Sequence, residues 1–413
     1  MLNIFMMKKQ GFIVILTVII LFIVNQLIVS FFTVPPTVNP DNLTDTSQIS
    51  SQKLFERAWK EIDTGFYDSS LNSQNWSYWK KHYKGKIETD EDAKVAIDTM
   101  LASLDDDYSR YLNKKEYAEQ NSSIESKISG IGVNIMNDAG KIVVYSVLDG
   151  TPAKTVGIKA NDIINKVDGK NVSGMNIADV ATLVRGKENT QVKLELIRNK
   201  QKITKIVTRK SIKIESVKSS IKNDIGYIQI SSFIGSSTTT EFLSALDKTK
   251  DAKGLLIDLR GNTGGLLANA IFVANAFLDN GTIVNIVARN GQVEDIKAQS
   301  SLLHIDKPIV LLVDGASASA SEILSGALKD HHKAIIVGTK TFGKGMVQRI
   351  IPLPNSTGLN LTIAKYLTPN GSDINKKGIV PDYVVKYTEH DFLTHHDPQR
   401  EKAEQILSIM ISR

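Results

Sequence analysis

The sequence predicts an α+β multidomain protein behind a single transmembrane helix, and three observations lead to this prediction. One long apolar segment lies near the N-terminus and is followed by a polar stretch that contains proline. The rest of the chain alternates short β-branched runs with segments in which apolar residues recur at helical spacing. At 413 residues the chain exceeds one ordinary domain, and 42% hydrophobic residues suffice for more than one core.

Composition excludes several kinds of chemistry. The chain has no cysteine, so disulfides, thiolate metal sites and cysteine nucleophiles are ruled out. Its seven histidines show no metal-ligand spacing, and the acidic run Asp105 to Asp107 is more typical of a solvated loop or a helix cap. We therefore predict no metal and no cofactor. A formal net charge of +6 is mild for this length and comes without a nucleic-acid motif, which predicts no nucleic-acid partner.

Residues 11–33 are predicted to form the transmembrane anchor. The stretch from Gly11 to Phe32 is almost entirely apolar, and at about 1.5 Å per residue it can cross a hydrocarbon core of about 30 Å. Lys8 and Lys9 precede it, so the positive-inside rule places residues 1–10 in the cytoplasm and the folded part outside. The alternative is a cleaved signal peptide, which the length of the segment and the lack of an A-x-A site disfavour.

Two further regions follow before the first predicted sheet. Residues 34–50 are rich in Pro, Thr, Asn, Asp and Ser, which predicts a flexible linker. Residues 51–118 form a predicted N-terminal helical region. Its apolar residues recur on two helix faces, at Leu54, Phe55, Ala58, Trp59 and Ile62 and again at Ala93, Ala96, Ile97, Met100 and Leu101. Between these faces lies the aromatic run Trp76, Tyr78, Trp79 and Tyr83, which we expect in a core, with an oligomer contact as the alternative.

Residues 119–209 contain strands, turns and one helix in an order similar to that of a PDZ domain. The predicted strand Lys141 to Val147 and the predicted helix Ile177 to Val184 are the main elements. A glycine-containing loop precedes them, and its free backbone N–H groups can hold a peptide carboxylate while the peptide adds as a strand. The candidate peptide-binding residues are Gly130, Ile131, Gly132 and Val133.

Residues 210–388 alternate predicted strands with helices and end in a strand at Asn360 to Leu367. The earlier elements are strands at Ile225 to Ile230 and Gly254 to Leu259, and helices at Thr238 to Leu246 and Leu266 to Leu278. Strand, glycine loop and helix also begin nucleotide-binding folds, but neither G-x-G-x-x-G nor G-x-x-x-x-G-K-[ST] occurs. Residues 389–413 are predicted to be a C-terminal helical tail, with a helix from Lys402 to Ile411.

A serine lies where a buried strand leads into a helix. The apolar run Ile309 to Val313 predicts the strand, and Ser319 stands at the predicted helix start. The first N–H groups of a helix have no intrahelical partner and can stabilise an oxyanion that forms beside them. This position suits a nucleophile, although a serine at a helix start is more often only a cap.

A lysine follows 25 positions later (344 − 319), in a glycine-flanked loop between predicted strands at Ala334 to Val337 and Met346 to Leu353. Lys344 can take the proton of a serine only when it is neutral, and burial favours that form by lowering the lysine pKa from about 10.4. Gln348 lies four positions further on (348 − 344), and strand periodicity predicts both side chains on one face. A lysine between glycines is more often a solvated turn residue.

Taken together, these segments resemble one family. SASASE at Ser317 to Glu322, a helix, and TFGKGMVQ at Thr341 to Gln348 resemble the signature of the C-terminal processing (tail-specific) serine peptidases, which carry a PDZ domain. The resemblance implies that Ser319 is the nucleophile, Lys344 the general base and Gln348 the residue that orients the lysine. It also implies an oxyanion hole made by the N–H groups of Gly265 and Ala320, in a ClpP/crotonase-like α/β serine peptidase core.

The resemblance and the anchor together predict a membrane-anchored serine endopeptidase of the cell membrane, single-pass, with extracytoplasmic catalytic domains. It would recognise substrate C-termini through its PDZ domain and cleave them through an acyl-enzyme. The expected partners are proteins or peptides with exposed C-termini and, through the N-terminal helix, the membrane; a homo-oligomer stays open. The alternative is a catalytically silent PDZ scaffold that binds C-terminal peptides of envelope proteins. G-x-S-x-G does not occur, which disfavours an α/β-hydrolase.

Overall fold

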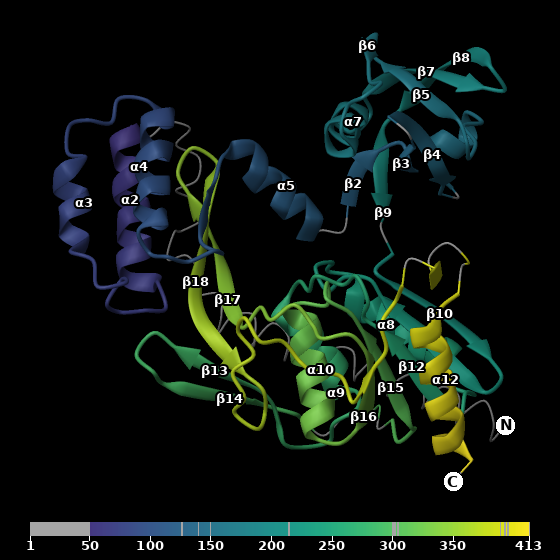
Figure 1. Ribbon diagram of the computed structural model, residues 1–413. Helices are drawn as coiled ribbons and strands as arrows, with labels where there is room; N and C mark the ends of the chain where they lie inside the picture. Colours follow the sequence, from purple (N-terminus) through teal and green to yellow (C-terminus); the bar gives the residue numbers. More distant parts are fainter. Residues whose placement is uncertain are drawn as a thin grey trace, which may run out of the picture. The chain divides into compact units, whose positions relative to one another are not determined.

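The computed structural model describes residues 50–412 apart from 125, 126, 139, 149, 214, 300–302, 304, 389, 392, 393 and 395. The chain divides into two compact units, whose elements are labelled in Figure 1. The first unit combines the chain up to Gln120 with Ser216–Arg413, and the second is Asn121–Glu215. The second unit is therefore inserted into the first along the sequence.

The prediction of a single transmembrane helix is corrected. Among residues 50–412, with the gaps given above, no helix is long and apolar enough to cross a bilayer. The longest described helix, α2 (Ser51–Gly65), has 15 residues. At about 1.5 Å per residue it falls short of a hydrocarbon core of about 30 Å. The single-pass membrane location and the extracytoplasmic placement depended on that anchor and are withdrawn with it. The predicted residues 1–10, 11–33 and 34–49 lie outside the described residues.

Three helices pack together after residue 50: α2, α3 (Trp76–His82) and α4 (Asp90–Ala102). Nearly all of the apolar residues predicted to face a core are buried, at Leu54, Phe55, Ala58, Ile62, Ala93, Ala96, Ile97, Met100 and Leu101, while Trp59 is partly buried. In the aromatic run, Trp76 is buried, Trp79 and Tyr83 pack against the same core, and Tyr78 is exposed. The core prediction is confirmed for three of these four aromatic residues.

The larger sheet of the first unit has six strands in the order β10-β11-β12-β15-β16-β19. Their bounds are β10 Val217–Lys222, β11 Ile225–Ile230, β12 Gly254–Asp258, β15 Ile309–Val313, β16 Ala334–Gly338 and β19 Tyr383–Val384. All neighbours are parallel except β10 and β11. Every residue of β12 and β15 is buried, as expected for parallel strands covered on both faces. The predicted strands β11 and β15 are confirmed.

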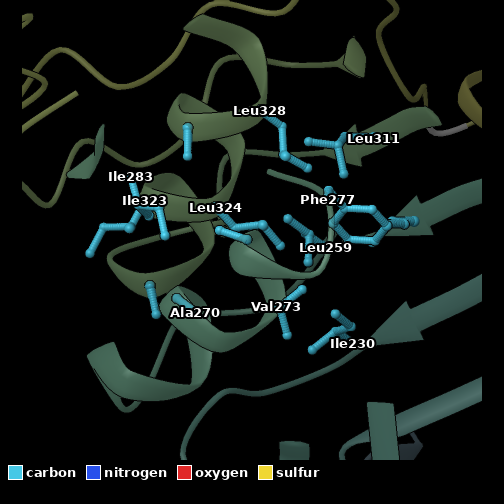
Figure 2. Packing of buried hydrophobic residues seen from close by; sticks show 14 of the residues in the cluster. Ile230, Leu259, Ala270, Val273, Phe277, Ile283, Leu311, Ile323, Leu324 and Leu328 are labelled. Atoms are coloured by element: carbon cyan, nitrogen blue, oxygen red, sulfur yellow. The ribbon is translucent and has the colours of Figure 1, made fainter. Parts of the chain in front are cut away.

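Helices cover both faces of this sheet. On one face lie α8 (Thr238–Lys248), α9 (Leu267–Asn275) and α10 (Ala320–Asp330), and on the other lies α12 (Pro398–Ile411). Figure 2 shows Leu324 and Leu328 of α10 packed with Leu311 of β15, with Val273 of α9 and with Phe277 just after that helix. The sheet therefore holds α10, and with it the predicted nucleophile, in a fixed place at the carboxyl end of β15.

A second sheet ties the N-terminal region to the same unit. It contains β1 Arg110–Leu112, β13 Thr282–Ala288, β14 Val293–Lys297, β17 Met346–Leu353 and β18 Thr357–Leu367. The long hairpin of β17 and β18 is its centre, and β1 pairs with β18 so that Arg110 lies opposite Asn360. The segment around residue 108 is thereby brought to the hairpin that follows the lysine loop. The sequence did not predict this pairing or the hairpin of β13 and β14.

The second unit contains its own sheet and core. The sheet has the order β3-β4-β5-β7-β8, with β6 beside β5, and a separate pair is formed by β2 and β9. The bounds are β2 Lys127–Gly130, β3 Val133–Asp138, β4 Lys141–Val147, β5 Ile163–Val167, β6 Lys170–Asn171, β7 Gln191–Arg198, β8 Gln201–Thr208 and β9 Lys210–Lys213, with α6 Pro152–Thr155 and α7 Ile177–Val184; α5 (Lys114–Ile124) leads in from the first unit. The predicted strand β4 and helix α7 are confirmed with the predicted bounds.

Candidate active site

Ser319 lies between β15 and the first turn of α10, as its N-cap residue. Its backbone has φ 54° and ψ −114°, a conformation that residues other than glycine rarely adopt. Neighbouring serines fix the segment that carries it: Ser317 Oγ donates to the carbonyl of Leu259 (2.8 Å) and Ser321 Oγ to that of Asn262 (2.9 Å). The unusual backbone of Ser319 is therefore imposed by contacts on both sides of it.

A glycine loop packs directly against Ser319. A Cβ placed on Gly264 would lie 2.7 Å from the carbonyl oxygen of Ala318 and 2.9 Å from Ser319 Cβ, so only glycine fits there. Asn262 holds the loop in place, because its buried side chain donates to the carbonyl of Ile230 (2.8 Å) and accepts from the N–H of Gly264 (2.9 Å). The loop and the serine segment thus form one rigid corner.

Two backbone N–H groups at this corner are free to donate. Gly265 bridges to Phe233, but the bonds of that bridge use the carbonyl of Gly264 and the N–H of Leu266. Ala320 is the first residue of α10, where an N–H has no intrahelical acceptor. Within the described part of the chain, neither N–H donates a hydrogen bond. They are the two donors that the family resemblance implies for an oxyanion hole.

Lys344 lies in the loop before β17 and is half-buried. Its ammonium nitrogen lies 4.9 Å from the centre of the Tyr108 ring and makes no hydrogen bond or ion pair with any described residue. Burial lowers the pKa of Lys344 from its usual 10.5; the negative charge of Asp106 acts against this, and the positive charge of Arg110 lowers it further. A neutral amine is therefore favoured here more than at an ordinary surface lysine.

Glu322, in the first turn of α10, joins the serine to the lysine loop. Its side chain is completely buried, and each carboxylate oxygen accepts two hydrogen bonds. Oε2 accepts from the N–H of Ser319 (2.9 Å) and of Lys344 (2.9 Å), and Oε1 accepts from the N–H of Gly343 (2.7 Å) and from Thr341 Oγ1 (2.6 Å). Hydrogen bonds to a carboxylate are strong, so Glu322 fixes the loop against the helix start.

We expect the substitution Glu322→Gln to lower kcat by about 10- to 100-fold, equivalent to about 1.4–2.7 kcal/mol. An amide turns one accepting oxygen into a donor, so two of the four donors would then face an NH2 group. The measurement is kcat for a peptide substrate. Glu241→Gln is the matched control. Glu241 lies on α8, outside this corner, and accepts from the N–H of Ser216 (2.7 Å) and from Ser237 Oγ (2.8 Å). An equal loss of kcat in both variants would contradict the role of Glu322.

The position of Gln348 relative to Lys344 does not follow the strand periodicity used in the prediction. Lys344 precedes β17, and a bulge between Val347 and Gln348 interrupts the alternation of the strand. Period-two geometry therefore does not apply between Lys344 and Gln348. The amide of Gln348 donates a long bond to Thr362 Oγ1 (3.4 Å), and its Oε1 accepts no hydrogen bond from the described residues.

Asp106 belongs to the same neighbourhood and is more than a solvated loop residue. Its Oδ2 accepts from Thr362 Oγ1 (2.7 Å) and from the N–H of Ser109 (2.9 Å). The hydroxyl of Thr362 thus lies between Asp106 and Gln348. Among the residues that the structure describes, no group of three His, Cys, Asp or Glu side chains is placed to hold a metal ion.

The candidate peptide-binding loop lies in the second unit. Gly130 ends β2, Val133 begins β3, and the carbonyls of Ile131 and Gly132 accept from the N–H groups of Ala153 (2.8 Å) and Leu148 (3.0 Å). Gly132 has φ +84° and packs against Thr151 so closely that a Cβ would lie 2.3 Å from it. The N–H groups of Ile131 and Gly132 donate to none of the residues described. This loop can therefore offer donors to an anion.

Comparisons with known proteins match both units. A model of peptidase family S41 matches residues 224–385, and a model of the PDZ domain matches residues 143–198. Carboxy-terminal processing protease CtpA of Bacillus subtilis (strain 168) is 38% identical over 348 residues, which cover 83% of this chain and 74% of that protein.

Two further comparisons agree. A probable CtpA-like serine protease of Staphylococcus aureus (strain COL) is 34% identical over 391 residues, which cover 94% of this chain and 75% of that protein. Among solved structures, the photosystem II D1 C-terminal processing protease is similar, with a TM-score of 0.57 and 32% identity over 82% of this chain and 94% of that chain.

Proposed function

Because this chain belongs to peptidase family S41 and is a serine-type carboxyl-terminal processing peptidase, we propose that it cleaves through a dyad of Ser319 and Lys344 and recognises substrate C-termini through its PDZ domain. The main support is Lys344, a half-buried lysine without an ion pair among the described residues, whose backbone shares the carboxylate of Glu322 with that of Ser319.

In the proposed reaction Ser319 Oγ attacks the scissile carbonyl while the neutral amine of Lys344 takes its proton. The tetrahedral oxyanion accepts hydrogen bonds from the free N–H groups of Gly265 and Ala320. When the C–N bond breaks, the ammonium of Lys344 returns its proton to the leaving amine, which gives an acyl-enzyme. Lys344, neutral again, takes a proton from a water molecule that attacks the ester, and returns that proton to Ser319 Oγ as the C–O bond of the ester breaks.

Gln348 is proposed to orient Lys344. Its amide nitrogen faces Thr362, which leaves the amide oxygen to accept a hydrogen bond from the lysine nitrogen. In the described structure that nitrogen lies over the Tyr108 ring, so a change of the lysine side-chain rotamer precedes catalysis. An amide suits this role because it adds no charge that would hold the lysine protonated.

The PDZ domain is proposed to bind the C-terminal carboxylate of the substrate. The support is the loop Gly130, Ile131, Gly132 and Val133, where two N–H groups donate to none of the described residues and a glycine with positive φ turns the chain. Main-chain donors recognise the end of a chain independently of its side chains, while strand addition lets the final residues be read by pockets.

This proposal is tested with two peptides of the same sequence, both ending in an apolar tail. One has a free C-terminal carboxylate, and in the other the C-terminus is amidated. We expect amidation to raise KM by about 10-fold and to change kcat less, because a charge-assisted bond of about 1.4 kcal/mol or more is lost in binding. Equal KM values would contradict carboxylate recognition by the PDZ domain.

The same preparation distinguishes an enzyme from a silent scaffold. A serine-directed fluorophosphonate should label the wild-type chain in the presence of the free-carboxylate peptide and should not label Ser319→Ala. Absence of labelling in the wild-type chain with and without peptide would favour the scaffold.

A further inference from the structure

We propose that Tyr366 is a positioning residue of the reaction. Its hydroxyl keeps Ser319, which carries the nucleophile, and Lys344, which carries the base, at a fixed separation. The inference rests on the proposed dyad of Ser319 and Lys344, and it concerns a residue that contacts the backbone of both without touching substrate.

Tyr366 comes from the second sheet and reaches into the core of the first unit. It lies on β18, opposite Ile286 of β13, and its side chain is only 1% exposed. The ring packs within the same hydrophobic cluster as α9 and α10, including Ala320 and Ile323. Its position is therefore fixed by close packing on all sides.

The hydroxyl of Tyr366 lies between two carbonyl oxygens from different elements. It bonds to the carbonyl of Ser319 at 3.1 Å and makes a shorter bond to the carbonyl of Lys344. The N–H of Tyr366 also donates to the carbonyl of Gly345 (2.9 Å), so the tyrosine is hydrogen-bonded to the lysine loop at two points. A single side chain thus spans the start of α10 and the lysine loop.

Tyr366 and Glu322 hold the same two residues through opposite backbone groups. Glu322 accepts from the N–H groups of Ser319 and Lys344, and Tyr366 lies at their carbonyls. Glu322 therefore holds the N–H side of Ser319 and Lys344, and Tyr366 holds their carbonyl side. Both side chains are buried and fixed. The carbonyl of Ser319 is also held by the first turn of α10, because it accepts from the N–H groups of Glu322 (2.8 Å) and Ile323 (2.9 Å). Among the described residues, the carbonyl of Lys344 is tied to this fixed point by Tyr366.

The chemistry of the hydroxyl suits this place. Burial, and then the negative charge of Glu322, raises the pKa of Tyr366 well above its usual 10, so the phenol keeps its proton and stays a donor. A phenol has one proton, and the shorter contact directs it to the carbonyl of Lys344, while the carbonyl of Ser319 lies beside the same hydroxyl. Without the hydroxyl, the two carbonyl oxygens, which carry like partial charges, face each other. Loss of the hydroxyl therefore moves the lysine loop away from the start of α10.

The test is Tyr366→Phe in the full chain, with Tyr227→Phe as the matched control. The control removes the hydrogen bond from the half-buried phenol of Tyr227 to Asp258 (2.9 Å), and no contact of Tyr227 with Ser319 or Lys344 is found among the described residues. We expect Tyr366→Phe to lower kcat by about 10- to 30-fold with KM within twofold of wild type, because misplaced reacting groups slow the chemical step and leave binding unchanged. The control should keep both constants.

The rate constant of labelling by a fluorophosphonate is the second readout. It should fall by a similar factor in Tyr366→Phe. With the probe in excess the labelling is pseudo-first-order, so its rate constant does not depend on what fraction of the variant is folded. A kcat and labelling rate equal to those of the Tyr227→Phe control would overturn the proposal. If Ser319→Ala also cleaves, the dyad itself is wrong, whereas an inactive Ser319→Ala beside a fully active Tyr366→Phe refutes only the role of Tyr366.

Discussion

Ser319→Ala is expected to reduce kcat by about 10⁴-fold or more for a protein with an apolar C-terminal tail, which leaves no cleavage detectable by gel electrophoresis over hours. No acyl-enzyme can form without the hydroxyl, and the free N–H groups of Gly265 and Ala320 alone supply only residual catalysis. The fold should persist, because alanine and serine meet the same backbone strain at φ 54°. Thermal unfolding measured in parallel checks this.

The matched control is Ser325→Ala on the same helix. Ser325 is buried and its hydroxyl donates only to the carbonyl of Ser321 (2.7 Å), one turn earlier in α10. Its removal should leave kcat within about threefold of wild type. Cleavage by Ser319→Ala at a rate close to that of Ser325→Ala would show that another group is the nucleophile.

Lys344→Met is expected to lower kcat by about 10³-fold or more, with a thermal unfolding temperature close to that of the wild type. Methionine keeps much of the apolar stem and, like the lysine, has no ion pair to lose among the described residues. Lys344→Arg should be equally inactive, because a guanidinium keeps its proton at any working pH. Activity retained in the arginine variant would exclude Lys344 as the base.

The pH dependence of the wild-type enzyme is a further test of Lys344 as the general base. The base works only when neutral, so kcat/KM should rise with pH through the pKa of Lys344 and then level off. Burial lowers this pKa from 10.5, so the rise should be centred below 10.5. A profile that falls with rising pH over this range would contradict the assignment.

The elements around the site were predictable because their signals are local. β11, β15 and β17 have the bounds that their apolar runs predict, and α10 begins one residue after Ser319. Continuous apolar runs mark strands that are covered on both faces, and helical spacing marks the helices that cover them. The residues that carry the family resemblance also lie in these segments.

Other features could not be read from local pattern. β14 is short and mostly exposed, so its sequence shows no apolar alternation, and the bulge at Gln348 breaks the periodicity on which the prediction of a shared face relied. Glu322 offers one available signal, since a carboxylate among apolar helix residues at the third position of α10 needs buried donors. Its four donors were not predictable, because three of them come from the loop about twenty residues later.

By itself the sequence determined the strands and helices around the site, because each depends on the spacing of apolar residues within one short segment. Only the tertiary structure decided that the Asp106 and Tyr108 segment lies beside Lys344, and that Glu322 and Tyr366 hold the backbone of Ser319 and Lys344 from opposite sides. The contact between Tyr108 and Lys344 joins residues 236 positions apart (344 − 108), and the pairing of β1 with β18 brings these segments together. Such pairing is set by the packing of whole sheets, which leaves no local trace in the chain.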